Sequence, residues 1–333
     1  MTFAFDVVPG WGQPPVQLLH EAVSAVDTDA QDRVYLLTRK AELVLVYDRD
    51  GRYLRGWSDP HFANVHGLTV GPDGNIWISD NGNHTVRKLT PDGKVLLTLG
   101  TMGGPTDTGY ADGPGAPPVR VHSSERVLRS AGPFNGCANV AFGPDGDVFV
   151  ADGYFNARVH RFSPDGELRR SWGEPGSGPG QFRLPHGIAI DRQGRVLVCD
   201  RENDRIQIFD PDGRYIEEWT DVQRPTDCDL DREGNVYVTE LWRPVEPGQA
   251  SFRLGMPERD LPGRLSVVDD RGRVLARWGA SSDDREAPGN FVAPHGICVD
   301  SRGDVYVSEV IGNFGVPRGV SAEAHQIQKF TRR

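Results

Sequence analysis

The chain has 333 residues, including 40 glycines and 25 prolines, and a formal net charge of −10 at pH 7. Valine, isoleucine and aromatic residues occur in short alternating runs between turn dipeptides, a pattern typical of many short strands. The acidic balance argues against nucleic acid as a partner, because phosphates call for a basic surface. No stretch approaches the roughly 20 apolar residues of a membrane span, so we expect no membrane partner.

The first residues, MTFAFDVVPGWG, contain neither a basic segment nor an apolar segment of the kind found in secretory signals. The four cysteines lack CxxC spacing and read as small buried thiols: Cys137, Cys199, Cys228 and Cys298. These features favour a cytoplasmic location, although a secreted chain without its signal would look the same.

Six segments of one pattern follow each other, beginning near Ala22, Val65, Cys137, Pro185, Pro225 and Pro294. The fourth reads PHGIAIDRQGRVLVCDRENDRIQIFDPDGRYIEEW, which gives four alternating runs separated by turns. Four strands in about 40 residues describe one blade of a β-propeller. The segments resemble NHL repeats, and the sequence predicts an all-β, six-bladed propeller.

The two chain ends are predicted to share the last blade. The sixth segment ends with its third strand, at HQIQKFTRR, and the N-terminal FAFDVVPGW resembles the fourth strands of other segments. Residues 3–12 are therefore expected to complete the sixth blade. A ring closed in this way makes residues 1–333 a single domain.

Three long insertions interrupt the repeats, at about 101–135, 241–262 and 310–324. If the strands of a blade are named A to D from the axis outward, all three follow a B or a D strand. They therefore lie on the face where strand A begins, called the top face below. Insertions gathered on one face mark a functional face, the alternative being tolerated loop growth. Their glycine, proline and charge content predicts a rim or lid rather than core.

Histidines occupy the top of strand A in alternate blades, at His66, His186 and His295. The other three blades carry Ala22, Ala138 and Thr226 at this phase. Alternate blades lie a third of a turn apart, so three imidazoles can converge on the axis. Three histidines with an open position are typical of catalytic zinc, and imidazole also suits other divalent transition metals. The alternative is packing at a repeat position, as we expect for the other six: His20, His61, His84, His122, His160 and His325.

A second phase follows strand B, also at the top, and carries Arg39 in blade 1 and Arg201 in blade 4. Two guanidinium groups beside a metal indicate a small-molecule substrate with a carboxylate. The alternative for Arg201 is an ion pair with a neighbour such as Glu202. Tyr154 follows the same phase in blade 3 and is a candidate general base, or else an inter-blade packing residue.

These residues lie in motifs that resemble peptidyl-α-hydroxyglycine α-amidating lyase from about residue 20 to 330. The most specific stretches are HGLTVGPDGNIWISD, VADGYFNARVHRFSPDGELRRSWG, QFRLPHGIAI and CDRENDRIQIF. The resemblance implies zinc on His66, His186 and His295, with Tyr154, Arg39 and Arg201 as catalytic groups. It also implies a lyase that breaks a carbinolamide C–N bond and releases an amide and glyoxylate.

Several positions depart from the family pattern. Ala293 stands where the family has a methionine, and Phe155 and Ile208 stand where it has disulfide cysteines. Gly296 stands where the family has an aspartate that helps to hold structural calcium, which puts that calcium site in doubt. A small α-hydroxy-amide is a better expected substrate than a hormone precursor.

Other readings remain open. They are a hydratase or hydrolase on the same metal site, and a non-catalytic NHL interaction platform. A calcium lactonase-type propeller would need carboxylates and amides at the axis. The sequence does not indicate an oligomeric state.

Overall fold

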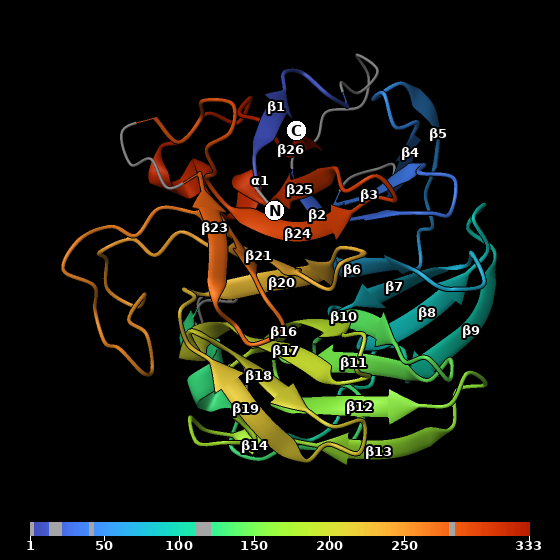
Figure 1. Ribbon diagram of the computed structural model, residues 1–333. Coiled ribbons are helices and arrows are strands. Elements are labelled where there is room, and N and C mark those ends of the chain that lie inside the picture. The colour runs from blue at the N-terminus through green and yellow to red at the C-terminus, as the bar shows by residue number, and fades with distance from the viewer. Residues whose placement is uncertain (1–2, 13–21, 40–42, 111–120, 280–283) are drawn as a thin grey trace.

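The computed structural model describes residues 3–12, 22–39, 43–110, 121–279 and 284–333. Six four-stranded antiparallel sheets surround one axis (Figure 1). The first strands of neighbouring blades contact one another all the way round. The predicted six-bladed β-propeller is therefore confirmed.

Blades 1 to 3 consist of β2 (Val23–Thr28), β3 (Val34–Thr38), β4 (Val44–Tyr47) and β5 (Tyr53–Trp57); β6 (Val65–Val70), β7 (Ile76–Asp80), β8 (Thr85–Leu89) and β9 (Val95–Gly100); and β10 (Cys137–Phe142), β11 (Val148–Asp152), β12 (Arg158–Phe162) and β13 (Leu168–Trp172). Blades 4 to 6 consist of β16 (Pro185–Ile190), β17 (Val196–Asp200), β18 (Arg205–Phe209) and β19 (Tyr215–Trp219); β20 (Pro225–Leu230), β21 (Val236–Glu240), β22 (Arg264–Val268) and β23 (Val274–Trp278); and β24 (Pro294–Val299), β25 (Val305–Glu309), β26 (Ile327–Arg332) and β1 (Phe5–Val8). A short parallel pair, β14 (Glu174–Pro175) and β15 (Gln181–Phe182), precedes blade 4.

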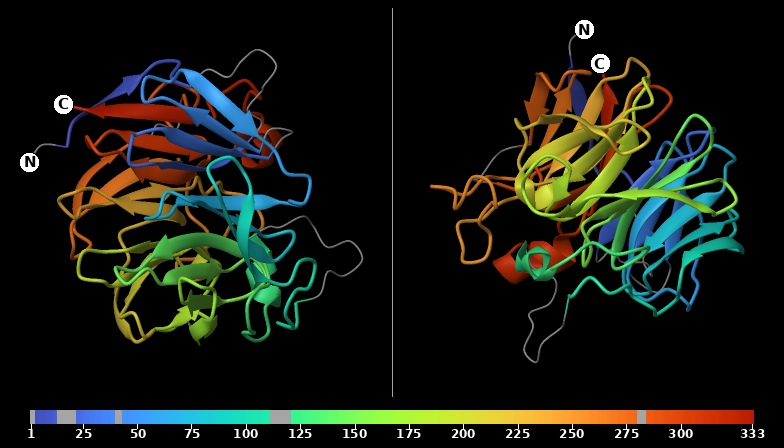
Figure 2. Two further views of the ribbon diagram at one scale, coloured as in Figure 1. Left: turned by 90° about the vertical axis from the view of Figure 1, so that its right-hand side faces the viewer. Right: turned by 90° about the horizontal axis from the view of Figure 1, so that it is seen from below.

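The N-terminal strand closes the ring, as predicted. β1 pairs antiparallel with β26, from Phe5 opposite Arg332 to Val8 opposite Lys329. The two strands lie side by side in Figure 1, blue against red, and the chain ends lie close together in both views of Figure 2. Both ends of the chain therefore hold one blade together.

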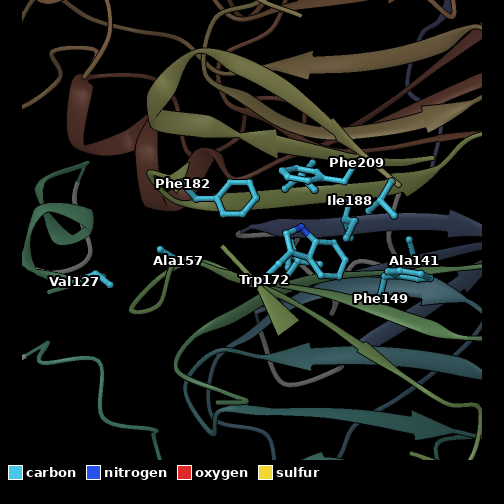
Figure 3. Packing of buried hydrophobic residues seen from close by; sticks show 12 residues of the cluster. Val127, Ala141, Phe149, Ala157, Trp172, Phe182, Ile188 and Phe209 are labelled. Atoms are coloured by element: carbon cyan, nitrogen blue, oxygen red, sulfur yellow. The ribbon is translucent and has the colours of Figure 1, made fainter. Parts of the chain in front are cut away.

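Tryptophans at the ends of the outermost strands join neighbouring blades. Trp172 contacts the glycine of the next blade's outer turn, Gly213, where an added Cβ would come within 2.6 Å of the indole. Figure 3 shows Trp172 between blades 3 and 4, close to Phe209 and Phe182. Trp11, just after β1, lies in the same way against Gly51 of blade 1. The N-terminal segment thus reproduces an ordinary fourth strand, including its inter-blade contact.

A buried carboxylate at the end of strand B fixes the entry to strand A in five blades. Examples are Asp80, whose oxygens accept from the amides of Ala63 and Asn64 at 2.8 and 2.9 Å, and Glu309, which accepts from Val292 at 2.8 Å. The five blade-end carboxylates are Asp80, Asp152, Asp200, Glu240 and Glu309. They satisfy amides that would otherwise be buried without partners, just before the residues that face the axis.

Blade 1 departs from the predicted phase. Val23 pairs with Thr38 as Val65 pairs with Asp80, so Ser24, not Ala22, occupies the phase of the histidines. The prediction of Ala22 was wrong because this blade has Thr38 in place of the carboxylate. It also has no His-Gly pair to mark the phase.

The three insertions lie between β9 and β10, β21 and β22, and β25 and β26. The last contains α1 (Ile311–Phe314) and η3 (Val316–Arg318), and the first contains η1 (Val121–Arg126). Their composition had predicted a rim or lid rather than core, but part of each insertion is buried. Phe134, Trp242 and Ile311 are buried, because each insertion turns apolar side chains onto the propeller. Residues 111–120 of the first insertion lie outside the described part.

The four cysteines are free and buried, as expected. No helix in the described residues is long and apolar enough to cross a membrane.

Candidate metal centre

The three histidines of alternate blades meet at the top of the axis. His66, His186 and His295 are the second residues of β6, β16 and β24, and we call them the axial histidines. Their nearest ligand atoms all lie within 4.8 Å of one another, and all three side chains are buried. The ring centroids are 4.6 to 4.8 Å apart. The geometric expectation from the repeat phase therefore holds.

Each axial histidine is oriented by the next blade. Nδ1 of His66 lies 2.8 Å from the Ala138 carbonyl oxygen, and Nδ1 of His186 lies 2.5 Å from that of Thr226. Nδ1 of His295 lies 2.6 Å from the Ser24 carbonyl oxygen. A carbonyl only accepts, so each Nδ1 carries the hydrogen and each Nε2 keeps a lone pair. A metal-binding histidine is usually held in this way.

A glycine follows every axial histidine for a steric reason. A Cβ on Gly67 would lie 2.5 Å from the Ala138 carbonyl oxygen, and one on Gly187 would lie 2.6 Å from the Asp227 Cα. At Gly296, a Cβ would come within 2.9 Å of the Ala25 Cα. The missing side chain lets the next blade approach closely enough to receive the imidazole N–H.

The environment keeps the axial histidines neutral. Burial lowers the pKa of His66 and of His186 well below the usual range, and burial also lowers that of His295 to about 3. The positive charge of Arg39 adds to the effect at His66 and His295. Three neutral imidazoles whose Nε2 atoms carry lone pairs are the donor set that a divalent transition metal requires.

Tyr154 reaches the same point from the loop after β11. Its hydroxyl lies 2.7 Å from His66 Nε2 and 3.1 Å from His186 Nε2. The side chain is buried, and its neighbour Gly153 cannot carry a Cβ because Pro185 O would lie 1.9 Å away. The hydroxyl is thus placed where it can exchange a proton with a group bound at the axis.

Arg201 stands beside Tyr154 but is not a free cation. Its Nε donates to Glu202 at 2.8 Å, and its Nη1 lies 3.5 Å from the Tyr154 hydroxyl. The ion pair with Glu202, one of the alternatives weighed for this residue, is therefore present. Nη1 still faces the tyrosine, so Arg201 serves both contacts.

Glu202 belongs to a buried charge cluster that the sequence did not indicate. Arg224 donates to it at 2.9 Å, and Arg243 Nη2 lies 4.0 Å from it and 2.8 Å from Asp204. Burial alone would raise the pKa of Glu202, but Arg224, Arg201 and Arg243 lower it to about 2. Three guanidinium groups face two carboxylates here, which leaves excess positive charge beside the axis.

Arg39 lies on the other side of the centre. Its Nε donates to the Val65 carbonyl at 3.3 Å, and its Nη1 donates to Asn313 of α1 at 3.0 Å. Within the described ranges, no carboxylate forms an ion pair with it. Burial lowers the pKa of Arg39, and the nearby Tyr154 has the opposite effect. Arg39 is thus a cation whose remaining surface suits an anion or a carbonyl.

Deeper along the axis lie three aspartates, Asp27, Asp227 and Asp229, called the axial aspartates, around a cavity of about 210 Å³. Each binds main-chain amides, as Asp27 does with Val70 at 2.7 Å. In the described part of the chain, the axial histidines alone bring three ligand atoms of His, Cys, Asp or Glu close enough for one ion. Carboxylates are therefore present at the axis, but not in the grouping that a lactonase-type calcium site needs.

The remaining histidines play structural roles where they are described. His160 is buried between Asp152 and Ser171, at 3.2 and 2.7 Å, and His61 is exposed beside Asp59. His84 Nδ1 accepts from the Gly136 amide at 3.1 Å, and His325 lies 2.9 Å from Glu309. His20 lies outside the described residues, as does the side chain of His122.

The NHL repeat family model matches residues 62–89 and 182–209. Peptidyl-glycine alpha-amidating monooxygenase B of Xenopus laevis is 34% identical over 204 residues, which cover 58% of this chain and 21% of the relative. The chain thus spans about a fifth of that relative. Peptidyl-alpha-hydroxyglycine alpha-amidating lyase 1 of Drosophila melanogaster is 29% identical over 291 residues, covering 82% of this chain and 47% of the relative.

A third relative matches over almost its whole length. NHL repeat-containing protein 3 of Homo sapiens is 28% identical over 315 residues, covering 86% of this chain and 84% of the relative. Among solved structures, virginiamycin B lyase from Staphylococcus aureus aligns with a TM-score of 0.59 at 15% identity, covering 99% of this chain and 100% of the other, and shows the fold alone. The chain is therefore an NHL-repeat β-propeller that resembles the peptidyl-α-hydroxyglycine α-amidating lyases, as its motifs predicted.

Proposed function

We propose that the protein is a metal-dependent carbon–nitrogen lyase acting on a small N-acyl-α-hydroxyglycine, a carbinolamide that carries a carboxylate. One observation carries the proposal: three neutral imidazoles present Nε2 lone pairs to one point, beside the Tyr154 hydroxyl. The relatives named as amidating enzymes or lyases support the same class of reaction.

The axial histidines would hold the metal. Zinc, when bound, supplies Lewis acidity at the point where the three nitrogens converge. The donor set fits this role because the main chain takes every Nδ1 hydrogen, so every Nε2 keeps its lone pair and faces the axis. Other divalent transition metals meet the same requirement.

Tyr154 would act as the base. Its oxygen takes the proton of the substrate hydroxyl, and the electrons of that O–H bond form the carbonyl of glyoxylate. The C–N bond breaks, its electron pair leaves on the amide nitrogen, and Tyr154 returns the proton there. Arg201, 3.5 Å from the tyrosine hydroxyl, would stabilise negative charge on the phenolic oxygen.

The two arginines would bind the carboxylate of the substrate. Arg201 keeps Nη1 free of Glu202, and Arg39 forms no ion pair within the described ranges. A planar guanidinium group suits a carboxylate through paired N–H donors. An uncharged substrate analogue should therefore bind poorly.

Two measurements test the proposal together. Metal content is determined by plasma mass spectrometry on protein purified without chelator, and glyoxylate release is assayed with α-hydroxyhippurate. About one transition metal per chain, with equal amounts of amide and glyoxylate, supports the lyase. Bound metal without glyoxylate would favour a hydratase or hydrolase, and no metal even after reconstitution would favour an interaction platform.

A further inference from the structure

A groove opens on the top face between blades 1 and 2, with a volume of about 350 Å³. Ser58 and Ala63 are exposed in its outer lining, whereas Leu43 and Val65 are buried in its floor. The groove is therefore open to solvent at one end and closed at the other. Its size falls in the range of small-molecule sites, roughly 300–1,000 Å³.

The closed end reaches the metal centre. Val65 directly precedes His66, and its carbonyl accepts from Arg39 Nε at 3.3 Å. Arg39 itself lines the groove and also acts electrostatically on Tyr154 and His66. A molecule bound at the axis that extends outward past Arg39 enters this groove.

The lining is mixed: Ser58, Asp59 and Asn64 are polar, the rest of the wall is apolar, and Arg39 is the cation at the inner end. Leu43 and Val65 belong to one hydrophobic cluster, against which Phe62 packs. The Arg87 guanidinium lies 4.5 Å from the centre of the Phe62 ring, and Asp59 accompanies Arg87 at 3.7 Å. The acidic group of the lining is thus balanced by a neighbour and does not oppose an anionic ligand.

We infer that this groove binds the acyl group of the substrate, and that aromatic acyl groups are preferred to acetyl. The inference rests on the proposed function, which places the hydroxyl and the carboxylate at the axis. The acyl group must leave that crowded centre, where the axial histidines are buried. The groove supplies an apolar wall of matching size, with Arg39 at the junction.

The test measures binding of two unreactive analogues, benzoylglycine and acetylglycine, by titration calorimetry on metal-loaded protein. Three proteins are compared: wild type, Ala63→Leu, which fills the outer groove, and Ala322→Leu, a matched change at an exposed residue outside it. Benzoylglycine should bind wild type at least about tenfold more tightly than acetylglycine. Ala63→Leu should remove most of this preference and Ala322→Leu none of it. Ser58→Leu, on another part of the lining, gives a second reading if Ala63→Leu folds poorly.

Equal affinity of wild type for the two analogues would overturn the inference, as would equal weakening of both by the groove variants. The proposed function fails separately. If α-hydroxyhippurate is not cleaved but Ala63→Leu still weakens benzoylglycine alone, the groove remains an acyl site and the lyase is wrong. If wild type releases glyoxylate from benzoyl and acetyl substrates with the same KM, the lyase stands and the groove assignment is wrong.

Discussion

The axis of the propeller has two layers of opposite chemistry, carried by the first strands of different blades: the histidines by β6, β16 and β24, and the aspartates by β2 and β20. In the upper layer, the axial histidines bond to protein through Nδ1 and leave Nε2 facing the axis. In the lower layer, the axial aspartates use their oxygens on main-chain amides, as Asp229 does with Leu230 at 2.8 Å and Val299 at 2.7 Å. Both layers are polar; the histidines and Asp227 are buried, and Asp27 and Asp229 are half-buried. The layers differ in what contacts their polar atoms: main-chain amides contact the carboxylates, whereas the Tyr154 hydroxyl contacts the Nε2 atoms of His66 and His186.

The lower layer therefore holds blades together. Asp27 of blade 1 accepts from Val70 of blade 2, and Asp229 of blade 5 accepts from Val299 of blade 6. Burial raises the pKa of Asp27 to about 7 and that of Asp229 to about 6, with mutual repulsion adding at Asp27. Carboxylates bonded to main-chain amides at an axis are thus no sign of a ligand site, whereas imidazole Nε2 lone pairs that converge on one point are.

Removing one axial histidine should have the largest effect. His186→Ala is expected to weaken metal binding more than about a hundredfold and to abolish turnover, because two imidazoles remain. His66→Ala and His295→Ala should behave alike. Metal content after dialysis checks this, with exposed His61→Ala as the control. One tightly held metal per chain in His186→Ala would mean that the upper layer is not the site.

The second-largest effect is expected from Tyr154, whose hydroxyl lies between His66 and His186. Tyr154→Phe should keep its metal and lose about 10²- to 10⁴-fold in kcat, because the general base is gone. Metal analysis and steady-state kinetics check both points, and wild-type turnover in this variant would contradict the base role.

A smaller effect is expected from the charge cluster behind Arg201. Glu202→Gln keeps the shape but removes the charge that holds Arg201 by its Nε, so we expect about a tenfold loss in kcat/KM with metal retained. If Glu202 positions Arg201, the loss should be larger for substrates with a carboxylate than for their amides. Exposed Glu323→Gln serves as the control. An equal loss with both substrate types would indicate a structural role only.

The smallest effect should come from the lower layer, and on stability rather than activity. The folded-state pKa of Asp27, about 7, lies above the ordinary value of 3.8, so its contribution to stability is complete below about pH 4. That contribution is lost as pH rises toward 7.

Asp27→Asn does not titrate, so it should lower overall stability but reduce the fall in unfolding free energy between pH 5 and pH 8, by about 2 kcal/mol. Urea unfolding at the two pH values measures this. An unchanged pH dependence would show that Asp27 stays ionised in the folded protein.

The sequence predicted the upper layer well because chain period and residue type coincide there. Each axial histidine precedes a glycine, and both are needed at the same place: the glycine admits the next blade, and the imidazole N–H bonds to it. Tyr154, Arg39 and Arg201 followed from the same phase. Blade 1 was misaligned because Ser24 lacks these markers.

Contacts between segments that lie far apart in the sequence could not be predicted from the repeat pattern. Arg224 ends a loop before β20, and Arg243 lies in the second insertion, yet both meet Glu202. Asp27 and Asp229 share one repeat phase, but Asp227 lies two residues earlier in its strand. The other four blades carry no acidic residue at the shared phase, so the repeat pattern did not mark this layer. Such contacts depend on how blades and insertions pack in three dimensions, which a repeat pattern does not encode.

The closure of the last blade determines when the candidate metal centre can form. His295 lies on β24, in the blade whose outer edge is supplied by β1, the first strand of the chain. β1 can therefore dock only after β26 has been synthesised. Until then the upper layer has at most two of its three imidazoles in a finished blade. If the site binds a metal as proposed, tight binding should require that β1 has paired with β26.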